Sequence, residues 1–324
     1  MTRTAPVAPP RTPSAPAPEP AAVRRRSRAR GRLSDAGYAT LLAAPAAVVL
    51  LALVGWPLVK LAVDSLYTGS GLGDGRSFAG LDNYLTALTD PGIRAAAGRT
   101  LAYTVIVVTA ELVLGLAVAL LFHRLGPKAR ILQTLFLYPL MIAPVVAGLL
   151  WRFLMIDNVG IVNELLTRVG VLGNPGDVSW LSDPDLVLFS VALPDIWLTT
   201  SFMTLVLYAG LQAIPPDLYE AARLDGARGL RLLVSVTLPL LRPVIAVALI
   251  IRGVDAARAF DVILIQTDGG PQSASETLSL TIYKTMVSYN DPGTAAATST
   301  LFMIVMMLVA MVAVLTIWRP GKES

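Results

Sequence analysis

Residues 38–59 read YATLLAAPAAVVLLALVGWPLV and carry no formal charge. About 20 mostly apolar residues are enough for a helix to cross the hydrocarbon core of a bilayer. The stretch is too long for the core of a signal peptide, and Lys60 follows it without a clear small-residue cleavage site. It therefore predicts a membrane-spanning helix.

Similar apolar runs recur along the chain. Those long enough to span a bilayer cover residues 100–122, 131–151, 186–214, 244–265 and 293–318. Prolines are expected to break several spans: Pro45 and Pro57 in the first run, Pro139 and Pro144 in the third, and Pro194 in the fourth. Together the runs predict an all-α membrane protein with six transmembrane helices.

The composition agrees with a membrane protein and excludes several classes of site. Of 324 residues, 55% are hydrophobic and 15% are charged, whereas a soluble globular chain has about 25% charged residues. The lack of cysteine excludes disulfides, thiolate metal sites and cysteine nucleophiles. With His123 as the only histidine and no P-loop motif, we expect no metal site, no ATP site and no catalytic residue in this chain.

Lysine and arginine predict the orientation of the spans, because cytoplasmic loops carry an excess of them. One set of loops, with both tails, holds 17 of these residues and the other set holds 5, leaving aside charges within or next to a span. Acidic residues are frequent in the loop after the third run, which belongs to the set with few lysines and arginines. Both termini are therefore predicted to be cytoplasmic.

The N-terminal segment differs from the rest of the chain. Residues 1–32 contain seven prolines and eight arginines, so we predict a disordered cytoplasmic tail over residues 1–34. We favour a role of the Arg24–Arg32 cluster in orientation over contact with anionic lipid headgroups. No folded basic face follows it, so we expect no nucleic-acid partner. The membrane domain then covers residues 35–320, and residues 321–324 form a second cytoplasmic tail.

The predicted cytoplasmic loop 215–239 is long and patterned. It starts with PPD at 215–217, which is typical of a helix start because proline suits the first turn and an acid suits the positive end of the helix dipole. Gly226 predicts the end of that helix, and a second amphipathic stretch leads into LP at 238–239. The loop therefore predicts two short helices joined by a glycine turn.

The same loop resembles the Glu-Ala-Ala loop of ABC-importer permeases. EAA at 220–222 is followed after three residues by Gly226, and LP at 238–239 stands at the family's spacing. The form YEAARLDGA at 219–227 looks like the carbohydrate-uptake branch, of the maltose and glycerol-phosphate type. A plain helical hairpin without a partner is the alternative interpretation of this loop.

A second segment resembles the same family near the outer end of the fifth run. It consists of AFD at 259–261 and TDGGP at 267–271. Asp268 stands where the family has a glycine, which is a departure from its pattern.

The resemblance implies a fold, a function and a set of partners. The fold would be that of a type I ABC importer permease in a bacterial inner membrane, and the function transport of a sugar or oligosaccharide delivered by an extracytoplasmic binding protein. A cytoplasmic ATPase dimer would bind ATP and magnesium, and a second, homologous permease subunit, favoured as a heterodimer partner, would complete the path. The residues expected to couple this chain to the ATPase are Asp217, Glu220, Ala221, Ala222, Asp225, Gly226, Leu238 and Pro239.

Several charges fall within the predicted spans, where each costs about 2.5–3.5 kcal/mol on insertion scales and so needs a partner or a polar cavity. The candidates for an intramembrane charge network are Glu111, Asp195, Arg252, Asp255 and Arg258. From Arg252 to Asp261 the charges alternate in sign every three residues, which predicts a ladder along one helix. We favour a structural network over direct substrate contact, with Glu111 and Asp195 pairing to Arg252 or Arg258.

Some residues are candidates for lining a sugar path, because sugars often stack an apolar ring face on an aromatic side chain. The aromatic candidates are Trp197, Tyr208 and Tyr138, and Asp261 is added because it belongs to the segment that resembles the family. Packing, or a belt at the membrane interface, is the alternative role for these aromatic side chains.

Three functions are open at this point. The first is the permease subunit of an ATP-driven importer, and the second is a proton-coupled secondary transporter that uses Glu111, Asp195 and Asp261. The third is an intramembrane enzyme, for which the sequence offers no nucleophile together with a general base. The loop 215–239 favours the first, because a secondary transporter does not require it.

Overall fold

The computed structural model describes residues 35–69 and 75–317. The predicted tails, residues 1–34 and 321–324, lie outside the described residues. The chain divides into two compact units, residues 1–55 and 56–324.

The described part of the first unit is helical. It consists of α1 (Asp35–Leu50) and a π-helical turn, η1 (Leu51–Gly55). Its apolar side chains from Leu42 to Val54 are exposed. Such a surface suits contact with lipid tails, as the uncharged run 38–59 predicts.

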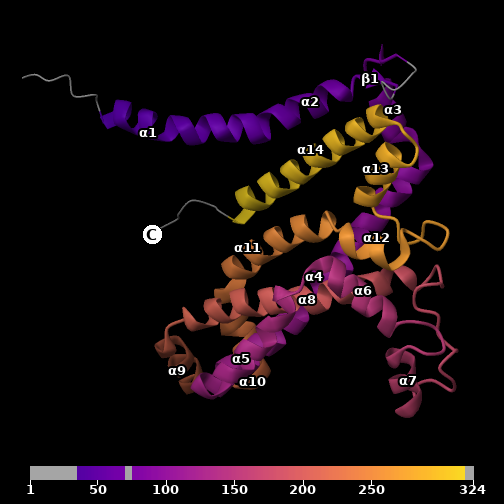
Figure 1. Ribbon diagram of the computed structural model, residues 1–324. Coiled ribbons are helices and arrows are strands. Elements are labelled where there is room, and N and C mark those ends of the chain that lie inside the picture. The colour runs from indigo at the N-terminus through magenta and orange to yellow at the C-terminus, as the bar shows by residue number, and fades with distance from the viewer. Residues whose placement is uncertain (1–34, 70–74, 318–324) are drawn as a thin grey trace, which may run out of the picture. The chain divides into compact units, whose positions relative to one another are not determined.

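The described residues of the second unit also form helices, apart from one short ribbon of two strands and the connecting segments (Figure 1). In chain order, its elements are α2 (Trp56–Asp64), β1 (Tyr67–Thr68), β2 (Ser77–Phe78), α3 (Asp82–Thr89), α4 (Pro91–Leu125), η2 (Gly126–Ala129), α5 (Arg130–Leu137), η3 (Tyr138–Met141), α6 (Pro144–Leu154), α7 (Ile161–Arg168), α8 (Val187–Gln212), α9 (Pro216–Leu224), α10 (Gly229–Leu232), η4 (Leu233–Thr237), α11 (Leu238–Ala257), α12 (Asp261–Thr267), α13 (Leu278–Val287) and α14 (Pro292–Ile317).

Five helices in the described ranges are long and apolar enough to cross a membrane. Their bounds are Leu42–Asp64, Pro91–Met141, Val187–Gln212, Gly229–Ala257 and Pro292–Leu315. Each overlaps one of the predicted runs, and Pro91–Met141 also takes in the start of the third run.

The third predicted run, residues 131–151, is not one straight helix. It is divided among α5, the 3₁₀ turn η3 and α6, with Ala143 in an extended conformation between the last two (ψ 137°). The residue before a proline avoids the helical region, which is why the chain opens at Ala143 before Pro144. The predicted proline break is therefore found in this run. The breaks predicted at Pro194 and Pro45 are wrong, because α8 continues through Pro194 and α1 through Pro45.

The fifth predicted run, residues 244–265, is also interrupted. The helix α11 ends at Ala257, and α12 starts at Asp261. The prediction of a continuous charge ladder is wrong at this point, because Arg258 caps α11 and Asp261 opens the next helix. The Thr277 hydroxyl lies 3.3 Å from the carbonyl oxygen of Ala259 and donates a hydrogen bond to it. A polar partner from another segment thus stabilises the break.

The core of the second unit lies where α4, α8 and α11 pack together (Figure 1). Gly115 on α4 makes the close approach to α8 possible: a Cβ there would lie 2.8 Å from Cγ of Met203 and 3.1 Å from the backbone nitrogen of Thr204. Apolar side chains such as Leu207 and Leu241 fill the space around this contact. These three helices therefore set the positions of the charges inside the membrane domain.

Candidate functional site

The first candidate site is the loop between α8 and α11. Its first helix, α9, begins at Pro216, which needs no hydrogen-bond partner for a backbone N–H in the first turn. Asp217 lies in the first turn and Arg223 in the last, so both charges suit the helix dipole. The helix ends before Gly226, whose φ of 81° is in the left-handed region that favours glycine. The predicted glycine turn is therefore present.

The surface of α9 is open. None of its residues is buried, and Leu224 is 89% exposed. Glu220 and Ala221 are exposed, and Ala222 is half-buried. The helix contacts α10 and η4, and the side chains of Glu220 and Leu224 lie on its exposed surface.

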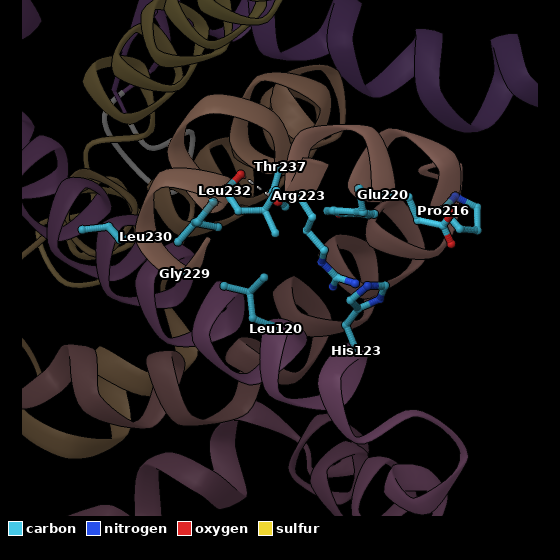
Figure 2. A pocket seen from close by; sticks show the side chains of 11 residues that line it. Leu120, His123, Pro216, Glu220, Arg223, Gly229, Leu230, Leu232 and Thr237 are labelled. Atoms are coloured by element: carbon cyan, nitrogen blue, oxygen red, sulfur yellow. Dashed lines mark hydrogen bonds between the residues drawn. The ribbon is translucent and has the colours of Figure 1, made fainter. Parts of the chain in front are cut away.

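A cavity of about 550 Å³ lies beside α9 (Figure 2). Its walls come from the end of α4, from α9 and from α10 with η4. His123 of α4 and Tyr219 of α9 face each other with ring centroids 6.0 Å apart, and Arg223 extends toward His123 (Figure 2). The hydroxyl of Tyr219 is buried and has no hydrogen-bond partner in the described part of the chain. The cavity thus lies between α9, the end of α4 and the segment that leads into α11.

The second half of the loop runs without interruption into the membrane. The helix α10 continues through the π-helical turn η4 into α11, and Pro239 lies in the first turn of α11. Proline lacks an N–H and its ring crowds the preceding turn, which a wider π-helical turn can accommodate. Pro239 therefore adapts the helix locally rather than ending it, and Leu238 stands where the turn joins α11.

The second candidate site is an ion-pair network buried between α4, α8 and α11. Arg252 donates from Nε to Oε2 of Glu111 (2.8 Å) and from Nη2 to Oε1 of the same residue (2.7 Å). The Arg252 side chain is 4% exposed and that of Glu111 is fully buried. Two parallel charge-assisted hydrogen bonds in this setting fix both the distance and the angle between α4 and α11.

Asp195 of α8 extends the network. Its Oδ1 lies 3.3 Å from Nη2 of Arg252, and its Oδ2 accepts a hydrogen bond from Tyr103 (3.1 Å). The Thr199 hydroxyl contacts Glu111 and accepts from Arg252 (3.0 Å). Sequence patterns did not single out Tyr103 or Thr199. The only local signal was the spacing of four residues between Asp195 and Thr199, which places both on one face of a helix.

The charges at the end of α11 differ in their surroundings. Asp255 binds Arg252 at 3.0 Å and Arg258 at 3.0 Å, and its side chain is 54% exposed. Arg258 and Asp261 are exposed as well. Of the two arginines proposed as partners of Glu111 and Asp195, the structure brings only Arg252 to them.

The aromatic path candidates do not come together. Trp197 packs against Trp151 with ring centroids 6.2 Å apart, and Tyr208 packs edge-on against Phe122 at 6.2 Å. Tyr138 is exposed on η3. The contacts of Trp197 and Tyr208 are those of packing between helices.

Comparisons with known proteins agree with these features. Residues 111–319 match the family described as "binding-protein-dependent transport system inner membrane component". The chain is 34% identical to the trehalose/maltose transport system permease protein of Thermococcus litoralis, over 87% of this chain and 93% of that protein. It is 35% identical to the sulfoquinovosyl glycerol transport system permease protein of Agrobacterium fabrum, over 86% and 90%.

Solved structures share the fold. A bacterial ABC transporter involved in the import of the acidic polysaccharide alginate has a chain that matches with a TM-score of 0.73 at 23% identity, over 88% of this chain and 96% of that chain. The family match covers more than half of the sequence, and it includes both the loop around α9 and the partners of Arg252. The chain therefore belongs to the inner-membrane components of binding-protein-dependent transport systems, as a multi-pass transport subunit and not an enzyme.

Proposed function

We propose that this chain is the permease subunit of an ABC importer that carries a sugar or oligosaccharide. A binding protein outside the cytoplasm delivers the sugar, and a cytoplasmic ATPase dimer, which binds ATP and magnesium, drives transport. A second, homologous permease subunit completes the path across the bilayer.

The observation that carries this function is the exposed helix α9 between α8 and α11. The helix ends at the glycine turn of Gly226, and none of its residues is buried. The C-terminal side of the loop continues into α11. A partner that pushes on α9 therefore acts directly on the helix that carries Arg252.

The names of relatives support a sugar as the cargo. The relatives from Thermococcus litoralis and Agrobacterium fabrum carry the names of trehalose/maltose and sulfoquinovosyl glycerol systems. A diacetylchitobiose uptake permease of Streptomyces coelicolor is 32% identical over 87% of this chain. Both neutral and anionic cargoes occur among these names.

The exposed charges on α11 support a second permease subunit. Ile251, Asp255 and Arg258 are exposed and lie on one side of the helix, three or four residues apart. Charged side chains are unfavourable against lipid, so this side faces a partner or a water-filled path. A homologous permease subunit would be such a partner, and a water-filled path would lie between the two subunits.

The buried network favours this function over proton coupling. Both carboxylate oxygens of Glu111 are held by Arg252, and Asp195 is held by Arg252 and Tyr103. Carboxylates paired in this way stabilise the packing of three helices. The network is then structural, and proton-coupled transport has no support.

The test is a pull-down of the ATPase together with sugar uptake. We expect Glu220→Lys and Ala222→Trp to leave the chain in the membrane but to weaken ATPase binding and abolish uptake. Ala95→Trp is the matched control, because Ala95 is exposed on α4 at the opposite, predicted outer end. Normal ATPase binding and uptake by Ala222→Trp, at normal abundance, would remove the main support for this function.

A further inference from the structure

A long apolar groove lies between α4, α11 and α14 of the membrane domain, where α11 and α14 lie side by side (Figure 1). Its volume is about 530 Å³, and its walls also include the end of α3 and the start of α13. Along α14 it extends from Thr298 to Ala313, which is about 22 Å of helix. The tails of one leaflet occupy about 15 Å, half of the hydrocarbon core, so the groove is long enough for a whole lipid tail.

The threonines that line the groove already have partners within the chain. Thr100 donates to the carbonyl oxygen of Ala96 and accepts from the backbone N–H of Leu278, both at 2.8 Å. Thr104 and Thr298 each donate to the carbonyl oxygen four residues earlier, also at 2.8 Å. The remaining wall is apolar except at one end. The groove therefore suits a hydrocarbon ligand, since a polar one would lose its bonds to water without compensation.

The exceptional end carries Arg94, the one charged residue of the lining. Arg94 is exposed near the start of α4 and forms no ion pair with any residue that the structure describes. The neighbouring carboxylate of Asp90 caps the helix by accepting from the backbone N–H of Ile93 (2.9 Å). The predicted topology places this end at the outer membrane surface, where lipid phosphates lie. A guanidinium binds a phosphate well, because it can offer two parallel hydrogen bonds.

The dimensions of the groove favour a lipid tail over a helix of another subunit. A helix about 22 Å long and about 10 Å wide fills roughly 1,700 Å³. The groove has less than half of that volume. A hydrocarbon tail is narrower than a helix and carries no side chains, so it can follow the groove along its whole length.

We propose that this groove holds an anionic phospholipid of the outer leaflet, with one tail between α11 and α14 and its phosphate on Arg94. The helix α14 contacts α3, α11 and α13. The tail fills the space that the side chains of these helices leave open, and it thereby stabilises α14 against the core. The lipid site does not depend on the cargo of the proposed function.

The experiment identifies the lipids that stay with the transporter when it is purified through a tag on this chain in a mild detergent. Native mass spectrometry counts them, and extraction of the same sample gives their headgroups. We expect at least one phospholipid per copy of this chain, enriched in anionic headgroups over the membrane from which it was taken. Absence of retained phospholipid, or a composition equal to that of the membrane, would overturn the site.

A charge variant assigns the headgroup to Arg94. Arg94→Gln changes an exposed position, and we expect it to weaken retention of the anionic lipid roughly 5-fold, the effect of one basic residue at an anionic membrane surface. Arg168→Gln is the matched control, because Arg168 is an exposed arginine on the same predicted side that does not line the groove. Equal losses from the two variants would contradict a phosphate site at Arg94.

A filled groove tests the position of the tail. Ala97→Trp places a large side chain in the groove and should displace the lipid whatever its headgroup, whereas Ala95→Trp on the same helix lies outside the lining and should retain it. Added phosphatidylglycerol should raise the thermal unfolding temperature of the delipidated wild type and of Ala95→Trp, but not that of Ala97→Trp. Full retention of lipid by Ala97→Trp would overturn the site.

A helix of a second subunit is the competing occupant. Because the chain has no cysteine, Ala97→Cys provides a single position for a photoreactive label. In native membranes we expect this label to cross-link to phospholipid. Cross-linking mainly to another permease subunit would assign the groove to an interface between subunits and would overturn the lipid site.

Discussion

Arg252 and Glu111 are separated by 141 residues in the chain and joined by two parallel hydrogen bonds of 2.8 and 2.7 Å in the interior of the membrane domain. The pair ties α4 to α11, and Asp195 adds α8. The helix α11, which follows the loop around α9, is therefore bound to α8, which precedes that loop, and to α4. Under the proposed function, movement of α9 would reach the packed helices through α11 and this pair.

Removal of one member of this pair should destabilise the protein strongly. Glu111→Leu leaves the Arg252 charge buried with only its weaker partners, and we expect a loss of about 3–5 kcal/mol. Abundance in the membrane and thermal unfolding in detergent measure the effect.

A double variant tests the physical reason. Glu111→Leu combined with Arg252→Met removes both charges, so much of the lost stability should return. If the double variant is as unstable as Glu111→Leu alone, the pair is not the source of the effect.

The sequence predicted the spans better than the contacts between them. Long apolar runs identified α4, α8 and α14, because length and apolar character are local properties. Pro144 also made the break before α6 visible. The break between α11 and α12 was not predictable, since no glycine or proline marks residues 257–261 and the Thr277 hydroxyl that binds the freed carbonyl of Ala259 comes from another segment.

The candidate sites also differ in how far they could be predicted from the sequence. The glycine turn of the loop follows from its own residues, and Gly226 has the left-handed backbone expected of it. The choice of Arg252 over Arg258 as the partner of Glu111 depends on where α11 ends. Tyr103 gave no signal in the sequence, because only the packing of α4 against α8 brings its hydroxyl to Asp195.

Gly226 should resist substitution because of its backbone and not for lack of space. A Cβ there meets nothing within 4 Å, but φ is 81°. We expect Gly226→Ala to cost about 1–2 kcal/mol in stability of the turn and to reduce ATP-driven uptake. Gly253→Ala is the control, since that glycine is helical, also has space and should become slightly more stable. Equal effects of the two variants on uptake would speak against a special role of the turn.

Gly115 should resist substitution for the opposite reason. A Cβ at this position would lie 2.8 Å from Met203 and 3.1 Å from the backbone of Thr204, so Gly115→Ala should push α4 and α8 apart at a cost of about 1–3 kcal/mol. Gly98→Ala on the same helix meets nothing within 4 Å and should be neutral or stabilising. Thermal unfolding of the two variants makes the comparison, and a stable Gly115→Ala would contradict the close packing of these helices.

Reporter fusions test the predicted orientation. Fusions at Gly75 and Gly176 should report the outer side and a fusion at Gly126 the cytoplasm, because lysine and arginine gather on the side of Gly126. A cytoplasmic signal at Gly176 would contradict the predicted orientation and with it the cytoplasmic placement of the loop around α9.

The most direct measurement of the central claim is sugar uptake into proteoliposomes that contain this chain, its permease partner and the ATPase. A labelled disaccharide and the binding protein are supplied outside, and either ATP inside or a pH gradient alone provides the energy. We predict uptake with enclosed ATP that is unchanged when the pH gradient is abolished and absent when α9 carries Ala222→Trp. Uptake driven by the pH gradient without ATP would contradict the assignment of this chain as an ABC permease.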